Sequence, residues 1–478
     1  MIIEDFRELK PLSCTWLISE PQRLQFNEAL TPFQHVIPKF TLPTRLSIAR
    51  YMSGFVDGFS NHHPFIHVQT LSFLAYHRSP EMILALLAIG AQYRYETKAA
   101  NVLYQAGRSI MLDRLHGGDL HPPVDVAQYR HASIPDTARR DYMDRTRAVL
   151  LLATYYSWQS QAASIQECLE YQGLIARSIR ATDLSQVPEH GLDWAHWASL
   201  EMDRRTMFFN WCLMNLQSFA YNSPPLLLSR ELDPLYLPCS CQEWTARGEA
   251  EWLAARARAP APVTFKEAHA SHLAICSDID PVSGVSPTGA YVHIYALLQR
   301  IYLTQQLSGD PGRRRSQDVQ DLEQALNRWR HTWRTSPESL IDLQNSYMSI
   351  SFTSTALLGA AHIRLHCDLG QWRRLQTGDP SLVATTLLQA PAPQRGPYLI
   401  YALLHSVHAL NIPAQLGISY LSRCQSFSWS IHHASCDLEC AVFLSKWLQL
   451  LAESQQREGP LSGISGPHFL HVTPEVTF

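Results

Sequence analysis

Residues 192–252 read LDWAHWASLEMDRRTMFFNWCLMNLQSFAYNSPPLLLSRELDPLYLPCSCQEWTARGEAEW, and they carry the densest apolar pattern in the chain. Two neighbouring stripes recur at the three- and four-residue spacing of a helix. The first stripe is Phe209, Leu213, Leu216 and Ala220, and the second is Met207, Trp211 and Met214. Because such a helix is apolar on nearly every side, we expect it to lie inside a large core rather than on the surface.

The residues on either side predict where this helix begins and ends. Four charged residues, Glu201, Asp203, Arg204 and Arg205, are interpreted as a turn that leads into the helix. The two arginines are expected to pair with the acids at the helix entry. The double proline at 224–225 predicts the end, because a proline nitrogen cannot donate a backbone hydrogen bond and the residue before a proline avoids the helical region.

Helical spacing recurs along the chain, whereas no β-alternation longer than a few residues and no internal repeat is present. Ser79, Pro80 and Glu81 form a typical helix start, with serine as the cap. The other predicted helices cover residues 48–59, 99–115, 142–160, 164–181, 265–278, 288–307, 318–334, 345–369, 398–411 and 430–454. The sequence therefore predicts an all-α fold, a large multi-helix domain packed around the central buried helix.

Proline spacing and composition predict the organisation of the chain. Residues 1–39 contain regularly spaced prolines and are expected to form an irregular N-terminal arm. Residues 40–455 are expected to form one helical regulatory domain, with a surface linker at 254–262. Residues 456–478 are rich in Gly, Pro and Ser and are expected to be a flexible tail.

Composition excludes several classes of protein. The 478 residues are 46% hydrophobic and 10% aromatic, as in a folded globular protein. A formal net charge of only −3 does not support DNA binding by bulk charge. The longest apolar runs are about half of what a membrane span needs. The acidic start and ten widely spaced cysteines favour an intracellular protein with free thiols and no membrane partner.

Two groups of residues contain the side chains that bind metal ions. His432, Cys436 and Cys440 share one helical face, but three donors over two turns span about 12 Å, which is too far for one ion. Core thiols are the favoured interpretation. The pair Cys239 and Cys241 lacks a second pair at zinc-site spacing. No metal ligand and no cofactor is therefore assigned.

No catalytic residue is assigned either, because the chain has no nucleophile elbow and no Gly-rich phosphate loop. The three histidines at 61–67 could include a catalytic base. Their aromatic neighbours favour a structural role instead, in a packed corner between two helices. Asp278 and Asp280 adjoin a turn, where a capping role is the ordinary explanation.

Two basic segments have both a structural and a functional interpretation. Residues 313–315, three arginines, could be a nuclear-import or phosphate-contacting patch, but a solvated loop is favoured. Residues 328–334 interleave arginine with tryptophan. On a helix Trp329 and Trp333 share one face and the arginines point elsewhere, so a core helix with solvent-reaching arginines is favoured.

The central region resembles the middle of the fungal-specific transcription factor regulatory domain, in the branch that usually follows Cys2His2 zinc fingers. The likeness extends over about residues 40–450 and depends on the order of its pieces. These pieces are Phe40–Pro43, Arg50-Tyr51, Phe59, His63–His67, Leu84–Ala91, Ala148–Trp158, Glu201–Phe219, Tyr221–Leu227, Glu231–Asp233, Trp244 and Trp252.

The resemblance implies a nuclear transcriptional regulator, not an enzyme, whose helical module adjusts activity while a separate zinc module reads DNA. No finger is visible here, so zinc is expected only in that module. The chain either acts without a finger, or has lost it from the gene model, or has another use. We expect partners in the transcription machinery or another transcription factor, and control of a metabolic pathway.

Homodimerisation and a small-molecule effector stay open. The alternative function is that of a small-molecule-binding protein or biosynthetic enzyme built on the same helices, which a deep pocket with converging polar groups would favour. Direct sequence-specific DNA binding by this chain alone is the weakest hypothesis, since the net charge of −3 does not support it.

Overall fold

The computed structural model describes residues 16–73, 77–117, 136–157, 163–181, 192–274, 284–307, 317–339, 348–417, 419 and 430–458. Within these ranges the regular elements are helices, and the β-pairing is limited to one isolated bridge between Tyr236 and Thr264. The predicted all-α class is confirmed.

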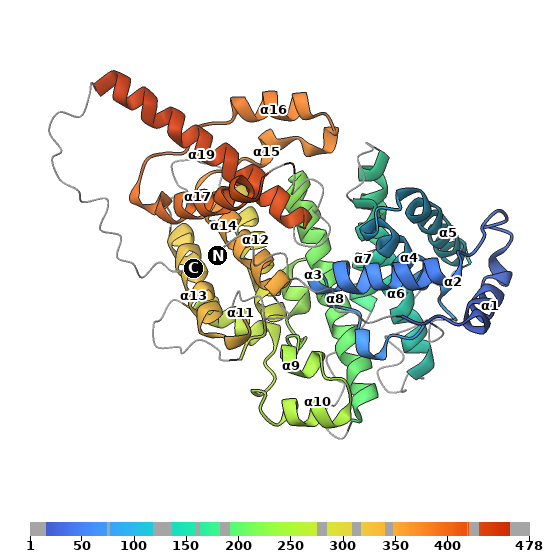
Figure 1. Cartoon of the computed structure of the whole chain (residues 1–478). Helices are drawn as coiled ribbons and strands as arrows, with labels where there is room; N and C mark the ends of the chain where they lie inside the picture. Colours follow the sequence, from blue (N-terminus) through green and yellow to red (C-terminus); the bar gives the residue numbers. More distant parts are fainter. Residues whose placement is uncertain are drawn as a thin grey trace.

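Helix α8 (Trp194–Tyr221) runs through the middle of the molecule (Figure 1, green). From Trp197 to Ala220 nearly every side chain is buried, which confirms the predicted central helix. The Asp193 carboxylate caps its first turn by accepting from the His196 amide at 2.8 Å. At the other end Asn222 adopts the left-handed conformation, with φ of 53°, two residues before the double proline begins.

The predicted charged turn is wrong. Residues 201–205 lie inside α8, which begins at Trp194, more than three turns before the first residue of the apolar stripes, Met207. Oppositely charged side chains three and four positions apart pair along a helix, so this charged segment is compatible with helix even where the stripe is interrupted.

The N-terminal helices lie on one side of α8 (Figure 1, blue to teal). The longer helices of this half are α2 (Arg45–Gly54), α4 (Pro80–Tyr93), α5 (Thr97–His116), α6 (Asp136–Ser157) and α7 (Ala163–Ala181). A π-helical turn (Phe55–Phe59) and α3 (Ser60–His62) continue α2. Helix α4 is buried almost throughout because α2, α5 and α6 pack around it.

The predicted cap of α4 is wrong in detail. Ser79 occupies the N-cap position, but its side chain makes no capping hydrogen bond. Glu81 in the first turn is fully buried, and its carboxylate lies 3.2 Å from Nε of Arg114 on α5. Glu81 therefore forms a buried ion pair between two helices in addition to lying in the first turn of α4.

The predicted irregular arm contains helix α1 (Glu20–Ala29). Ser19 and Gln22 form a reciprocal capping box at its start, and Pro21 lies in its first turn. Phe26 is fully buried and packs 4.8 Å from the Phe73 ring. The spaced prolines predict irregular chain, but the first turn of a helix tolerates proline.

The later helices lie on the other side of α8 (Figure 1, yellow to red). They are α11 (Phe265–Leu273), α12 (Pro287–Leu307), α13 (Gln317–Thr335), α14 (Met348–His366), α15 (Gly370–Arg373), α16 (Pro380–Gln389), α17 (Ile400–Leu416) and α19 (Ile431–Glu458). Short 3-10 turns connect elements at Thr31–Phe33, Val68–Thr70, Ser229–Leu232, Pro337–Ser339, Leu375–Thr377 and Pro397–Leu399. Helix α14 packs against α12, α17 and α19 and forms the centre of this half.

Two short helices, α9 (Cys241–Trp244) and α10 (Glu249–Arg256), cover one end of α8. Helix α10 includes the beginning of the linker predicted at 254–262, and its Trp252 and Ala255 are buried. Trp252 packs against Trp197 of α8, with ring centres 5.2 Å apart. The prediction is therefore wrong for residues 254–256, whereas 257–262 form an irregular, mostly exposed segment.

None of the helices in the described ranges is both long and apolar enough to cross a membrane.

Candidate functional site

The charged residues in the middle of α8 form a buried ion cluster rather than a surface patch. Arg205 is 1% exposed, and its Nε donates to Oε1 of Glu201, one turn earlier, at 2.7 Å. The other carboxylate oxygen accepts from Arg204 at 2.5 Å, and the backbone amide of Cys239 donates to Oε1 at 2.9 Å. Burial opposes the charge on Glu201, but the two arginines outweigh it and hold its pKa below the usual value.

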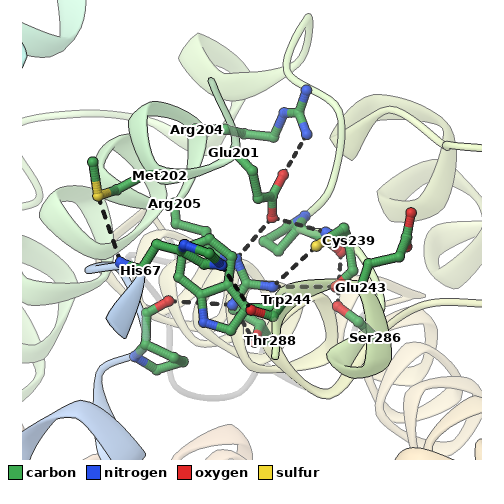
Figure 2. Close-up of polar contacts among 12 residues, drawn as sticks. His67, Glu201, Met202, Arg204, Arg205, Cys239, Glu243, Trp244, Ser286 and Thr288 are labelled. Atoms are coloured by element: carbon green, nitrogen blue, oxygen red, sulfur yellow. Dashed lines mark hydrogen bonds and ion pairs between the residues drawn. The ribbon is translucent and has the colours of Figure 1, made fainter. Parts of the chain in front are cut away.

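Arg205 joins four segments that are far apart in the sequence (Figure 2). Its Nη1 donates to the Pro64 carbonyl at 3.2 Å and lies 3.5 Å from the hydroxyl of Thr288 at the start of α12. Its Nη2 donates to the Cys239 carbonyl at 3.2 Å. The guanidinium carbon lies 4.0 Å from the centre of the Trp244 ring, a cation–π contact.

His67 completes this cluster as a neutral structural residue. Its Nε2 donates to the Trp244 carbonyl at 3.0 Å, and its Nδ1 lies 2.9 Å from the Thr70 hydroxyl. Burial and the nearby Arg205 charge lower the pKa of His67 to about 4. Both ring nitrogens are therefore engaged, and the ring packs between Trp194 and Trp244.

A second buried ion cluster links α8 to α6. Arg147, which is fully buried, donates to Asp144 at 2.6 Å, to the Thr206 hydroxyl at 3.1 Å and also to Asp203. Burial raises the pKa of Asp144 to about 6, against the opposing effect of Arg147. Asp203 therefore attaches α8 to α6, whereas Arg205 attaches it to the segment at Pro64, to Cys239 and to α12.

A third cluster lies at the C-terminal end of α8. Glu439 of α19 is 1% exposed and binds Arg364 of α14 at 2.5 Å and Arg373 of α15 at 2.6 Å. Arg364 also donates to the Phe219 carbonyl at 2.7 Å, and its guanidinium lies 3.4 Å from the centre of the Phe219 ring. This arrangement attaches the C-terminal helices to the last turn of α8.

The residues that build these clusters include those on which the family resemblance rests. The fungal specific transcription factor domain matches residues 52–331, more than half of the chain, and the fungal transcription factor C-terminal domain matches residues 368–468. The chain belongs to the fungal-specific transcription factor family. No zinc-finger family matches it. Neither the curated proteins nor the solved structures contain a match. Membership places this protein among transcriptional regulators rather than enzymes.

In this fungal transcription factor domain the candidate metal residues lie in separate environments. His432 Nε2 is 3.0 Å from the Tyr291 hydroxyl, and Cys436 belongs to the main core. Cys440 lies in a different apolar cluster, with Leu399 and Phe443. Among the described residues no group of three or more His, Cys, Asp or Glu is arranged to hold a metal ion.

The other sequence candidates also have structural surroundings. Burial, with Glu201 beside Cys239 and Glu338 beside Cys241, raises the pKa of both thiols well above the usual value. Trp329 is buried and donates from Nε1 to the Ala290 carbonyl at 2.9 Å, which confirms the predicted core helix. Residues 278–280 and 313–315 lie outside the described residues.

A hollow of about 310 Å³ opens between α11, α12 and α13. Its lining residues are Leu273, Arg300, Thr304, Leu307, Asp318, Asp321 and Leu322. It is partly open, and its Arg300 and Asp318 are exposed to solvent. It therefore differs from the deep pocket with converging polar groups that the alternative, small-molecule function requires.

Sequence reasoning found the pairing of Glu201 with its arginines, but not their partners. Pro64, Cys239 and Thr288 contribute a carbonyl, an amide and a hydroxyl from distant segments. Every residue has a backbone carbonyl, so the sequence does not indicate which of them will bind a buried side chain. Glu439 was also missed, although a glutamate between Cys436 and Cys440 on an apolar helix face is a signal for a buried ion pair.

Proposed function

We propose that this protein is the regulatory module of a nuclear transcriptional regulator that controls genes of a metabolic pathway. It acts through protein partners, and contact with DNA is made by a separate module. The observation that carries the proposal is the family's ordered signature, which lies in the buried junctions around Arg205 and Asp203. Residues used to hold helices together suit a scaffold that presents its surface to partners.

The test is a reporter assay. The full chain is fused to a heterologous DNA-binding domain and expressed in a fungal cell with the matching operator upstream of a reporter. We expect reporter output to change at least several-fold, up for an activator and down for a repressor. The DNA-binding domain alone is the control, and imaging of a tagged chain reports localisation.

Deletion of the gene provides the second arm. We expect a coherent set of metabolic transcripts to change in the deletion strain and to return when the gene is restored. If the tagged chain is excluded from the nucleus and transcript levels do not change, the proposal is wrong.

A further inference from the structure

Helix α17 is a surface helix without a charged residue. Its sequence, IYALLHSVHALNIPAQL, contains no Asp, Glu, Lys or Arg. One face packs against α14 and α19, where Ala402 and Ser406 are fully buried. The opposite face is open, with Ile400 45% exposed and Val407 55% exposed. A surface helix ordinarily carries charged residues on its outer side, so this face is unusual.

The exposed residues of α17 form a continuous stripe. Ile400, Leu404, Val407 and Asn411 follow one another at four-, three- and four-residue spacing, which places them on one side of the helix. Leu404 is half-buried and Asn411 is exposed. We call these four residues the α17 stripe. Exposed apolar patches bordered by polar groups mark interaction sites on soluble proteins.

A basic edge runs beside the α17 stripe. The Arg330 guanidinium of α13 lies 4.5 Å from the centre of the Tyr401 ring, and His405 and His408 follow Tyr401 on the same side of α17. Burial lowers the pKa of His405 to about 4, and Arg330, His408 and Arg334 lower it further. Arg330, Arg334 and His408 therefore lie near His405. We call Arg330, Arg334 and His408 the basic edge.

We infer that the α17 stripe and the basic edge together bind an acidic amphipathic helix of a partner protein. Leucine-like side chains of the partner would cover the stripe, and its carboxylates would lie along the basic edge. Charge complementarity selects this occupant: a second copy of the same face would bring two basic edges together, which is unfavourable. The inference rests on the proposed function, because it supplies the surface through which protein partners act.

The test uses the purified full chain and a fluorescein-labelled 20-residue peptide in fluorescence anisotropy. The probe repeats leucine at i, i+3, i+4 and i+7 and carries Asp or Glu elsewhere. We expect saturable binding that weakens as salt is raised. The Val407→Lys variant should lose at least tenfold in affinity, because a lysine then occupies the middle of the apolar stripe. Arg330→Glu should lose affinity and regain it for a probe with Lys in place of Asp and Glu.

Val102→Lys is the matched control. Val102 is 53% exposed on α5, close to the 55% of Val407 on α17, so both substitutions add a lysine to an exposed helical valine. We expect Val102→Lys to bind the acidic probe like the unmodified protein. Circular dichroism and a thermal melt verify that both variants stay folded.

Several outcomes would overturn the inference. The first is that the acidic probe does not bind. The second is that the unmodified protein binds a scrambled or lysine-substituted probe equally well. The third is that Val407→Lys and Val102→Lys lose the same affinity for the acidic probe. A dimer in sedimentation velocity that Val407→Lys dissociates would assign the surface to a second copy instead. Because anisotropy does not depend on transcription, a negative result with an intact reporter response rejects only the surface. Normal peptide binding without any reporter response rejects only the proposed function.

Discussion

Arg205 shows what a single buried side chain does in this fold. Its planar guanidinium donates in several directions at once, to the Glu201 carboxylate and to the carbonyls of Pro64 and Cys239, while its face covers Trp244. A lysine has one compact ammonium group and cannot reproduce this geometry. The charge is tolerated in the core because Glu201 neutralises it and backbone groups satisfy the remaining donors.

Removing the carboxylate should therefore be costly. In the Glu201→Ala variant the Arg205 charge stays buried without its partner, and we expect the free energy of unfolding to fall by about 3–5 kcal/mol. Urea unfolding followed by circular dichroism measures this change. The control is Glu231→Ala, which breaks the pair with Arg180, whose side chain is 54% exposed. That loss should stay below about 1 kcal/mol, and comparable losses in the two variants would contradict the prediction.

At the scale of elements, α2 and α4 cross with their backbones in contact. A Cβ added to Gly90 would lie 1.9 Å from the Tyr51 carbonyl oxygen, and one added to Gly54 would lie 2.4 Å from the Gly90 carbonyl oxygen. Both glycines are helical, so no unusual backbone conformation requires them. Close approach of the two helices is the reason for glycine at these positions.

Two glycine-to-alanine substitutions test this close approach. Alanine ordinarily stabilises a helix relative to glycine by about 0.5–1 kcal/mol, and we expect this gain for Gly173→Ala on α7, where a Cβ meets nothing within 4 Å. Gly90→Ala should instead destabilise the protein by about 2–3 kcal/mol, because the two helices must separate. Thermal melts of the two variants measure the difference. If both variants melt at a higher temperature than the unmodified protein, α2 and α4 do not pack as described.

The helices could be predicted to the extent that apolar spacing revealed them. The stripes of α8, α13 and α19 were visible, because each buries one or more faces in a continuous core. Apolar spacing does not predict helix α1, because a short helix with a capping box and one buried phenylalanine has little periodicity. The first turns of α8 were interpreted as a turn because their contacts are ionic, and ionic contacts depend on partners from elsewhere in the fold.

At the scale of the whole molecule, three ion clusters attach α8 to its surroundings. Arg147 and Asp203 join it to α6, and Arg205 joins it to the corner near Pro64 and to α12. Arg364 of α14 joins its last turn, and Glu439 of α19 holds Arg364 together with Arg373 of α15. The sequence indicated the charges on α8 but not these pairings, since they unite residues up to 145 positions apart. Such long-range contacts leave no periodic signal.

Buried histidines predict how the whole molecule responds to acid. Burial is the main cause that lowers the pKa of His67, His269 and His405 to about 4, and of His272, His432 and His433 to about 3. The unfolded chain binds these protons below pH about 6.5, whereas the folded chain does not, so stability must decrease as pH falls from about 6.5 toward 4. Asp144, with its pKa raised to about 6, has the opposite effect on stability, because its folded state holds a proton that the unfolded state releases. This effect amounts to one proton only.

Each such histidine lowers the free energy of unfolding by about 1.4 kcal/mol for every pH unit below about 6.5. A typical domain has a free energy of unfolding of only about 5–15 kcal/mol. We therefore expect the urea midpoint of unfolding to fall between pH 6.5 and 5.5. Glutamine does not titrate. The His405→Gln variant should therefore show a smaller slope of unfolding free energy against pH, by the equivalent of about one proton. A midpoint that stays constant from pH 7.5 to 5.5 would contradict the buried, neutral state of these rings, because only a group with the same pKa in both states leaves stability independent of pH.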